Sequence, residues 1–326
     1  MKFIIYNYRV KKVINKIWKS NFLNDNIFFK KILNQQINNK INQYKNKPFC
    51  VRVENTNICN AKCVMCPRDL MTRKQGVMSM DISHTIIDQC VDIGVDYINL
   101  HNYGEPLIDP NFVDKVKYAK NKGIKRVSTN TNASLLTKEI SRNLILSGLD
   151  ELFVSIDAIK KETYEKVRMN LDYDVLMSNL LNFLEIKKEL NGKTGLVVNF
   201  VQSDINENEV REFIEFWKGK ADNASISYAH DWVGSKKDST NVKKGRLDYP
   251  CRLLFSDLTI AWNGDYILCC ADYNSQVVLG NIENISIPDL WRNNKILNKY
   301  RELHLNGQSH TLDICHECTL NTVWWF

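Results

Sequence analysis

Strand-like and helix-like segments alternate along residues 48–230, and this alternation limits the possible folds more than any other feature. The strand-like runs are CVRVEN (50–55), DYINLHN (96–102), IKRVSTN (124–130), ELFVSID (151–157), GLVVNFVQ (195–202) and SISYAH (225–230). Helices are predicted near 81–94, 109–123, 137–147, 174–190 and 206–218, the second opened by Asp109. Because parallel neighbours need crossover connections, this order predicts an α/β fold with a parallel sheet. Periodicity alone does not decide whether the sheet curls into a barrel.

Composition divides the chain into four predicted regions. They are a basic, partly helical leader (1–47), the alternating segment (48–230), a polar linker (231–250) and a small cysteine-rich unit (251–326). The leader has eleven Lys and Arg against one acid and a net charge of +10, whereas the remainder has 33 basic and 36 acidic residues and a net charge of −3. The basic character of the protein therefore belongs to the leader.

Within the leader, apolar residues recur at helical spacing. Val13, Ile14, Ile17 and Trp18 would form one face of a short helix, with lysines on the other. Such a helix either packs against the body or contacts a membrane surface or another polyanion; no nucleic acid is expected as a partner. No run approaches the roughly 20 apolar residues of a membrane span, and no signal peptide is recognisable, so a cytoplasmic location is expected.

Ten cysteines without a secretion signal predict metal or redox chemistry, because the cytosol keeps thiols reduced. Three of them, Cys59, Cys63 and Cys66, directly follow the first predicted strand, where parallel α/β folds collect their ligands. Three thiolates can hold a four-iron cluster and leave one iron open to a substrate. The alternative is a zinc site with a distant fourth ligand, and the first His or Cys after Cys66 is His84.

The C-x-x-x-C-x-x-C pattern resembles the signature of the radical S-adenosylmethionine (SAM) superfamily. The resemblance implies a [4Fe-4S] cluster whose open iron binds SAM, and reductive cleavage of SAM to a 5′-deoxyadenosyl radical. It also implies a reducing partner such as flavodoxin or ferredoxin. Met65 occupies the position that lies by the adenine in the family.

Further motifs follow at the ends of the next predicted strands, in the family's order. Gly104, Glu105 and Pro106 resemble its glycine-glutamate-proline motif, in which the acid accepts from the SAM ammonium group and glycine lets the backbone approach the ligand. Tyr103 replaces a first glycine, and Ala133 replaces the glycine after Asn132. The resemblance implies SAM contacts for Asn132, and ribose or carboxylate contacts for Ser155, Asp157 and Arg168.

A second group of cysteines lies in the last 76 residues. Cys251, Cys315, Cys318 and either Cys269 or Cys270 could close a four-ligand site, as iron-sulfur or as a zinc ribbon. Asn263-Gly264 predicts a type I′ hairpin turn with two positive φ angles. The adjacent cysteines would follow on its second strand and point in opposite directions. Cys50 and Cys90 are expected to be buried apolar residues.

The spacing of this group resembles the SPASM/twitch extension of radical SAM enzymes, and most of all the twitch unit of butirosin-type aminocyclitol dehydrogenases. On that likeness Cys269 is the fourth ligand, and the site holds a second, auxiliary [4Fe-4S] cluster. The implied fold is a partial (β/α)6 TIM-type barrel followed by a small cysteine-rich twitch/SPASM-like domain.

The leading functional hypothesis is hydrogen abstraction from a small-molecule substrate, a sugar or an aminocyclitol. In a dehydrogenase the substrate radical would pass an electron to the auxiliary cluster; in an epimerase a thiol, for which Cys270 is the candidate, would return a hydrogen atom.

Three alternatives remain. One is a peptide maturase, although the 47-residue leader is short and Asn-rich for a peptide-recognition domain. The second is a molybdenum-cofactor cyclase, whose Gly-Gly tail the terminal Trp-Trp-Phe does not match. The third is a non-catalytic iron-sulfur or zinc protein.

Overall fold

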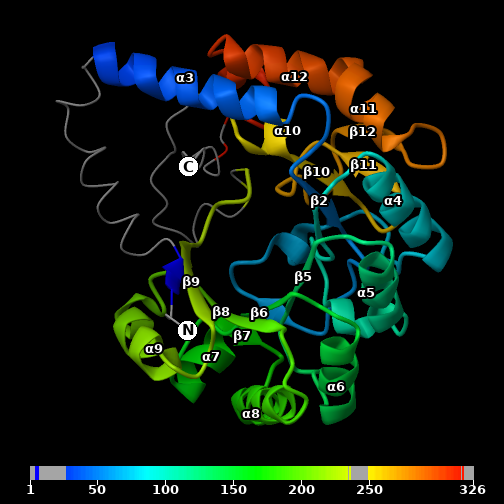
Figure 1. Cartoon of the computed structure of the whole chain (residues 1–326). Helices are drawn as coiled ribbons and strands as arrows, with labels where there is room; N and C mark the ends of the chain where they lie inside the picture. Colours follow the sequence, from blue (N-terminus) through cyan, green and yellow to red (C-terminus); the bar gives the residue numbers. More distant parts are fainter. Residues whose placement is uncertain (1–3, 7–26, 234, 236–248, 317, 319–326) are drawn as a thin grey trace.

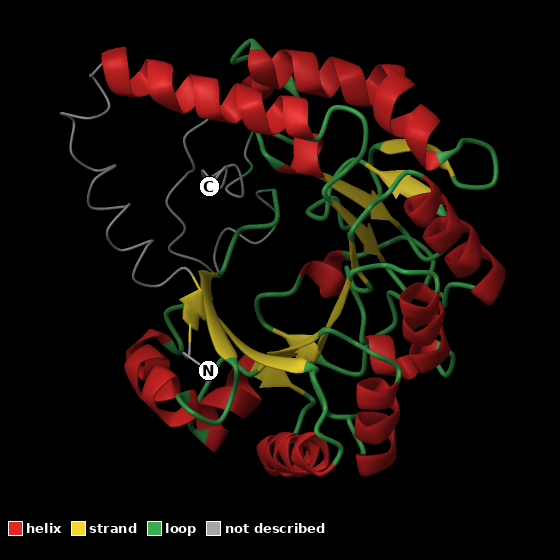
Figure 2. Ribbon diagram, viewed as in Figure 1, coloured by secondary structure: helices red, strands yellow, loops and turns green. Residues whose placement is uncertain are grey.

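A curved sheet with helices on its outer face forms the body of the protein (Figures 1 and 2). The computed structural model describes residues 4–6, 27–233, 235, 249–316 and 318. The order of the strands in the sheet is β1-β9-β8-β6-β5-β4-β2-β10-β11-β12. All neighbours from β1 to β10 are parallel, and β10, β11 and β12 are antiparallel. The predicted α/β class, with a mostly parallel sheet consistent with a partial barrel, is confirmed.

The six predicted strands form the middle of this sheet, and other strands extend both edges. The strands are β1 (Ile4–Tyr6), β2 (Cys50–Val53), β4 (Tyr97–Asn99), β5 (Arg126–Thr131), β6 (Glu151–Ser155), β8 (Gly195–Gln202), β9 (Asn223–Tyr228), β10 (Asp257–Ile260), β11 (Asp265–Ile267) and β12 (Val278–Asn281). A separate antiparallel pair joins β3 (Lys62–Cys63) to β7 (Arg168–Met169). The leader thus supplies a strand that sequence analysis missed, and β10 continues the sheet beside β2.

The helices begin close to where the sequence predicts them, because capping side chains mark several starts. Ser79, Thr137 and Asp172 each accept a hydrogen bond from a backbone N–H in the first turn. The helices are α3 (Ile27–Gln43), α4 (Met80–Asp92), α5 (Phe112–Asn121), α6 (Lys138–Leu146), α7 (Lys161–Val167), α8 (Tyr173–Glu189), α9 (Val210–Trp217), α10 (Leu253–Ser256), α11 (Ile287–Asn293) and α12 (Lys295–Leu305), with short 3₁₀ turns η1 (Pro67–Leu70), η2 (Pro106–Ile108), η3 (Glu207–Glu209) and η5 (Ser309–Thr311). Within the described residues, no helix has both the length and the apolar character that crossing a membrane requires.

Two local predictions were wrong. Asp109 does not open α5. One of its carboxylate oxygens accepts a hydrogen bond from the Asn111 N–H, and the other forms an ion pair at 2.6 Å with the ammonium group of Lys115. Each charge of this buried pair therefore has an opposite charge beside it. The hairpin between β10 and β11 is not type I′, because of its central residues only Gly264 has a positive φ, of 86°. The Gly264 N–H donates to the Ala261 carbonyl and closes the turn. This is the three-residue hairpin loop whose last residue is a glycine with a positive φ.

Two other expectations cannot be followed in the structure. The predicted helix around residues 13–18, with its possible membrane contact, lies outside the described residues, as does most of the predicted linker.

Candidate functional site

The loop that carries the first three cysteines is anchored to a distant part of the barrel. Cys63 lies in β3 and pairs with Arg168 of β7, and Cys66 immediately precedes η1. The Val64 N–H donates to the Val167 carbonyl at 3.0 Å, and the Cys66 N–H to the Cys63 carbonyl at 3.1 Å. The loop conformation therefore depends on the chain after α7 as well as on the cysteine motif.

The three thiols lie close enough to influence one another. Burial raises the pKa of the Cys66 thiol to about 11, and the neighbouring Cys63 and Cys59 contribute to this rise. Burial also raises the pKa of Cys59, whose sulfur accepts from the Ala61 N–H at 3.5 Å. Within the described chain, no three His, Cys, Asp or Glu side chains are arranged to hold a single metal ion. A four-iron cluster is larger than a single ion and takes thiolate ligands, so the three thiols fit such a cluster.

Arg68 also stabilises this loop, although sequence analysis did not select it. Its Nη1 donates to the carbonyls of Cys59 and Ala61, at 3.2 and 3.3 Å. Its charge lowers the pKa of Cys59 and Cys66, the thiols at the two ends of the loop, although desolvation outweighs it. The only sequence signal for this residue was a basic side chain two residues after the third cysteine.

Gly104 and Glu105 form a tight junction with the cysteine loop. Gly104 has a φ of 80°, and a Cβ there would lie 2.3 Å from the Thr56 carbonyl oxygen, so only glycine fits. Gly104 thus lets another part of the protein's own backbone, at Thr56, come close to it. Glu105 is 2% exposed, and its carboxylate accepts from Thr131 Oγ1 at 2.6 Å, the Asn132 N–H at 2.7 Å and the Leu107 N–H at 3.1 Å. A carboxylate offers about four acceptor positions, so one stays available for the SAM ammonium group that the resemblance implies.

Asn132 connects this junction to the cysteine loop. Its Nδ2 donates to Asn60 Oδ1 at 2.9 Å and lies 4.0 Å from the Cys59 sulfur. The next residue, Ala133, is fully buried and has a φ of 58°. The backbone conformation that a glycine would favour is therefore kept, although the side chain differs from the family pattern.

Asp157 and Arg168 form a buried ion pair beside Cys63. Arg168 Nε donates to Asp157 Oδ2 at 2.7 Å, and Nη1 lies 3.4 Å from the Cys63 sulfur. Asp157 is 0% exposed, and its other oxygen accepts from the Val201 N–H. In these contacts Asp157 orients Arg168, and Arg168 places positive charge beside a thiol. Direct contacts of either residue with SAM stay a prediction.

The remaining predicted SAM contacts occupy different surroundings. Met65 is buried against Val167 and Ala229, and its contact with adenine stays a prediction. Ser155 ends β6 in register with Asn199 of β8 and is only partly buried. Pro106 begins η2 and is buried, so it shapes the chain directly after Glu105.

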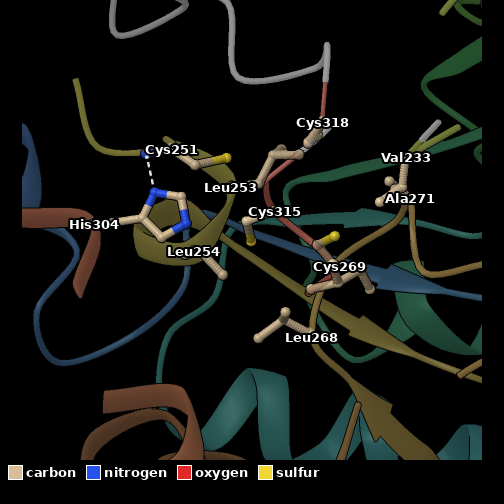
Figure 3. Close-up of a pocket in the computed structure, with 11 residues that line it drawn as sticks. Val233, Cys251, Leu253, Leu254, Leu268, Cys269, Ala271, His304, Cys315 and Cys318 are labelled. Carbon is tan, nitrogen blue, oxygen red and sulfur yellow. Dashed lines mark hydrogen bonds between the residues drawn. The ribbon is translucent and has the colours of Figure 1, made fainter. Parts of the chain in front are cut away.

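The C-terminal cysteines gather in a second, mostly apolar pocket (Figure 3). Cys251, Cys269, Cys315 and Cys318 line it together with leucine side chains and His304. Burial raises the pKa of Cys251 to about 12 and that of Cys269 well above its usual value, so the free thiols are neutral and a metal would have to displace their protons.

Of the two adjacent cysteines, Cys269 is among the residues that line this pocket and Cys270 is not. Cys269 lines the pocket with the other three cysteines, whereas Cys270 interacts electrostatically with Arg52 and Asp257 of the barrel strands. Both cysteines follow the end of β11 instead of lying within it. The arrangement favours Cys269 as the fourth ligand.

A direct link joins the two cysteine regions, and sequence analysis missed it. The Tyr103 hydroxyl donates to the Cys270 carbonyl at 2.7 Å, and its ring lies 5.7 Å from that of Trp232. Trp232 Nε1 in turn donates to the Met65 carbonyl at 2.5 Å. Tyr103, which replaces the first glycine of the family's motif, therefore contacts the loop that carries Cys269 and Cys270, here called the auxiliary loop.

Polar side chains line part of the concave face of the sheet. Arg52, Asn99 and Ser128 stand in register on β2, β4 and β5. Asn99 accepts from Arg52 Nη1 at 3.2 Å and donates to Ser128 Oγ at 2.8 Å and Asn130 Oδ1 at 3.3 Å. Alternate residues of these strands, such as Val51, belong to the hydrophobic core. Because the helices cover the outer face, this polar row faces inward (Figure 2).

Family models match most of the chain. Residues 53–216 match the radical SAM superfamily, and residues 251–319 match SPASM, an iron-sulfur cluster-binding domain. Among curated proteins, a probable GTP 3′,8-cyclase of Methanococcus maripaludis is 29% identical over 166 residues, which is 51% of this chain and 54% of that protein. The corresponding protein of Methanothermobacter thermautotrophicus is 30% identical over 171 residues, 52% of this chain and 54% of the relative. The match thus spans about half the length of the curated relatives.

Solved structures share the fold at low sequence identity. BtrN in complex with AdoMet and 2-DOIA is 19% identical with a TM-score of 0.59, and the match covers 85% of this chain and 96% of BtrN. SuiB of Streptococcus suis bound to the precursor peptide SuiA is 16% identical with a TM-score of 0.66, covering 85% and 72% of the two chains. The family match over the first cysteine motif and the SPASM match over the second establish the cofactors as SAM with its [4Fe-4S] cluster and an auxiliary cluster. This chain therefore belongs to the radical SAM superfamily and carries a C-terminal SPASM domain.

Proposed function

We propose that this enzyme oxidises a sugar or an aminocyclitol after removing a hydrogen atom from one of its carbons. When bound, the SAM cluster would supply a carbon radical that abstracts the hydrogen atom, and the auxiliary cluster would accept the second electron as the substrate hydroxyl releases its proton to solvent. The observation that carries the proposal is the hydrogen bond between Tyr103 and the Cys270 carbonyl. It ties the loop before Glu105 to the loop of Cys269, and a short path between the two centres is what a two-electron oxidation needs.

The inward polar row supports a small polar substrate. Asn99 and Asn130 carry amides that both donate and accept, which suits hydroxyl groups. Arg52 adds a charge whose Nε has no hydrogen-bond partner within the described residues. Asp257 lies 3.8 Å from that guanidinium group and offers a carboxylate for an amine. In the proposed enzyme these side chains orient the substrate.

The likeness to BtrN also supports the proposal, because it extends over 96% of that protein, whose structure contains 2-DOIA. A flavodoxin or ferredoxin as electron donor is part of the same proposal. The role of the leader stays a prediction.

Two other functions have specific support. Epimerisation is supported by Cys270, which lies beside Arg52 and outside the second cysteine pocket, where a thiol could return hydrogen to the substrate. Peptide modification is supported by the likeness to SuiB, which was solved with its precursor peptide.

The deciding experiment uses anaerobically reconstituted protein with dithionite, SAM and candidate sugars or aminocyclitols deuterated at carbon. The proposal predicts deuterium in 5′-deoxyadenosine and a carbonyl product that contains no solvent deuterium in D₂O. Solvent deuterium on the product carbon, lost in Cys270→Ala, would identify an epimerase instead. If SAM is cleaved but no candidate transfers deuterium, while a precursor peptide does, the sugar hypothesis is wrong.

A further inference from the structure

His304 lies in the second cysteine pocket, although nothing in the sequence pattern singled it out. It stands in the last turn of α12 and is 3% exposed. It lines the same pocket as Cys251, Cys269, Cys315 and Cys318 (Figure 3). A polar ring in a pocket lined mainly by apolar and sulfur-bearing side chains needs a hydrogen-bonding partner for each nitrogen.

The hydrogen bond to one nitrogen fixes the protonation of the other. Nδ1 accepts from the Cys251 backbone N–H at 3.2 Å, so it carries no proton. In the neutral ring the proton is therefore on Nε2, which makes Nε2 a donor. Nε2 is buried and has no partner within the described residues. In Figure 3 it lies on the side of the ring that faces Cys315.

The position of the ring is held from both sides. Arg301, one helical turn earlier, donates from Nε to the Leu254 carbonyl at 2.9 Å and from Nη1 to the Trp291 carbonyl at 2.7 Å. These bonds fix α12 against α10, which begins two residues after Cys251. The donor is thus fixed in direction before any cluster binds, and a buried donor left without a partner is unfavourable.

We propose that His304 donates a hydrogen bond from Nε2 to a sulfur of the auxiliary cluster and thereby raises the reduction potential of that cluster. The inference rests on the assignment of the cluster to Cys251, Cys269, Cys315 and Cys318. Hydrogen bonds to cluster sulfurs are one of the factors that set these potentials, because they stabilise the more negative, reduced state. In this role His304 would act on the cluster and on the backbone of its ligand Cys251.

Two substitutions separate the two nitrogens. His304→Asn places an acceptor near the Nδ1 position and removes the donor, whereas His304→Gln places an amide near Nε2 and loses the acceptor for Cys251 N–H. Each is made in full-length protein that also carries Cys59→Ala, Cys63→Ala and Cys66→Ala, so that only the auxiliary cluster is observed. His310→Asn, at an exposed histidine, is the matched control.

We expect His304→Asn to shift the reduction equilibrium about tenfold toward the oxidised cluster, or about 59 mV for one electron. His304→Gln should keep most of the parental potential, and His310→Asn all of it. An unchanged potential in His304→Asn, or an equal shift in the control, would overturn the role of His304. Iron-free protein in the triple-alanine background would instead overturn the assignment of the ligands, and the inference with it.

A spectroscopic test needs no substitution at position 304. In the reduced triple-alanine protein, electron-nuclear double resonance should detect one strongly coupled proton that exchanges in D₂O, together with a weak ¹⁵N coupling when histidine is labelled. Absence of both couplings contradicts the hydrogen bond. A strong coupling from directly bonded nitrogen would make His304 a ligand and would also overturn the proposal.

Discussion

The two cysteine sites are built in opposite ways. The first takes its three cysteines from eight consecutive residues, and polar groups hold that loop: Arg68 directly after it, and Glu105, Asn132 and Arg168 from other segments. The second gathers four cysteines that are spread over 68 residues into a pocket lined mainly by apolar groups. In the first, the protein shapes the loop before the cluster arrives; in the second, the cluster itself would join distant segments. The first cluster should therefore matter most for chemistry and the second for stability.

The largest expected effect is on SAM cleavage. Cys63→Ala should lower 5′-deoxyadenosine formation at least about 1000-fold, because one ligand of an already three-ligand site is lost. Its melting temperature should change by only a few degrees. Cys315→Ala should show the reverse: detectable SAM cleavage and a clearly lower melting temperature. Similar losses of stability in both variants would contradict the contrast between the sites.

The buried ion pair beside Cys63 should have the next largest effect. Arg168→Met leaves the Asp157 carboxylate buried without its charge partner, and should lower the free energy of unfolding by about 3–5 kcal/mol. The double variant Arg168→Met/Asp157→Asn should recover much of this stability while SAM binding stays weak. Urea denaturation and SAM titration measure the two effects separately. A double variant that is no more stable than the single one would argue against the pair.

Tyr103→Phe tests the link between the two regions. It removes one hydrogen bond and leaves the Cys270 carbonyl unpaired, so about 1–3 kcal/mol of stability should be lost. The fraction of SAM cleavage events that yield oxidised substrate should fall, since the auxiliary loop is less firmly held. Tyr118→Phe, which also removes a tyrosine hydroxyl that donates to another residue but lies away from both sites, is the control. If the fraction of SAM cleavage events that yield oxidised substrate is unchanged in Tyr103→Phe, the proposed oxidation loses its main support.

The smallest effect is expected at Ala133. Glycine there should raise the free energy of unfolding by about 1 kcal/mol, because the backbone already adopts a positive φ. SAM affinity should be unaffected. A destabilised Ala133→Gly variant would show that the Cβ contributes packing that outweighs the backbone strain.

The periodic and local features of this protein were predictable from its sequence. The six central strands lie close to their predicted ranges, because buried parallel strands between capped helices leave a strong pattern. Contacts between remote segments left no such signal: β1 pairing with β9, β10 with β2, and Tyr103 with Cys270. Asp109 was predicted to open a helix because Asp is a common N-cap residue, and its pairing with Lys115 leaves no pattern in the sequence.

At the sites, the sequence predicted a cysteine loop after the first strand but put Cys269 and Cys270 on a hairpin strand, whereas both follow the end of β11. It could not reveal which contacts hold either segment. His304 is an example: a single histidine in a helix has no distinguishing pattern in the sequence. Its role is indicated only by the hydrogen bond that its ring accepts from the Cys251 backbone N–H.

The pairing of β10 with β2 has a consequence for how the chain is made. About 200 residues separate the two strands, so during synthesis the backbone groups along the β2 edge have no protein partner until β10 leaves the ribosome. An unpaired edge of this kind recruits other chains. Because this pairing comes late, we expect a chaperone to bind the nascent barrel early. We also expect fragments that stop before residue 257 to aggregate.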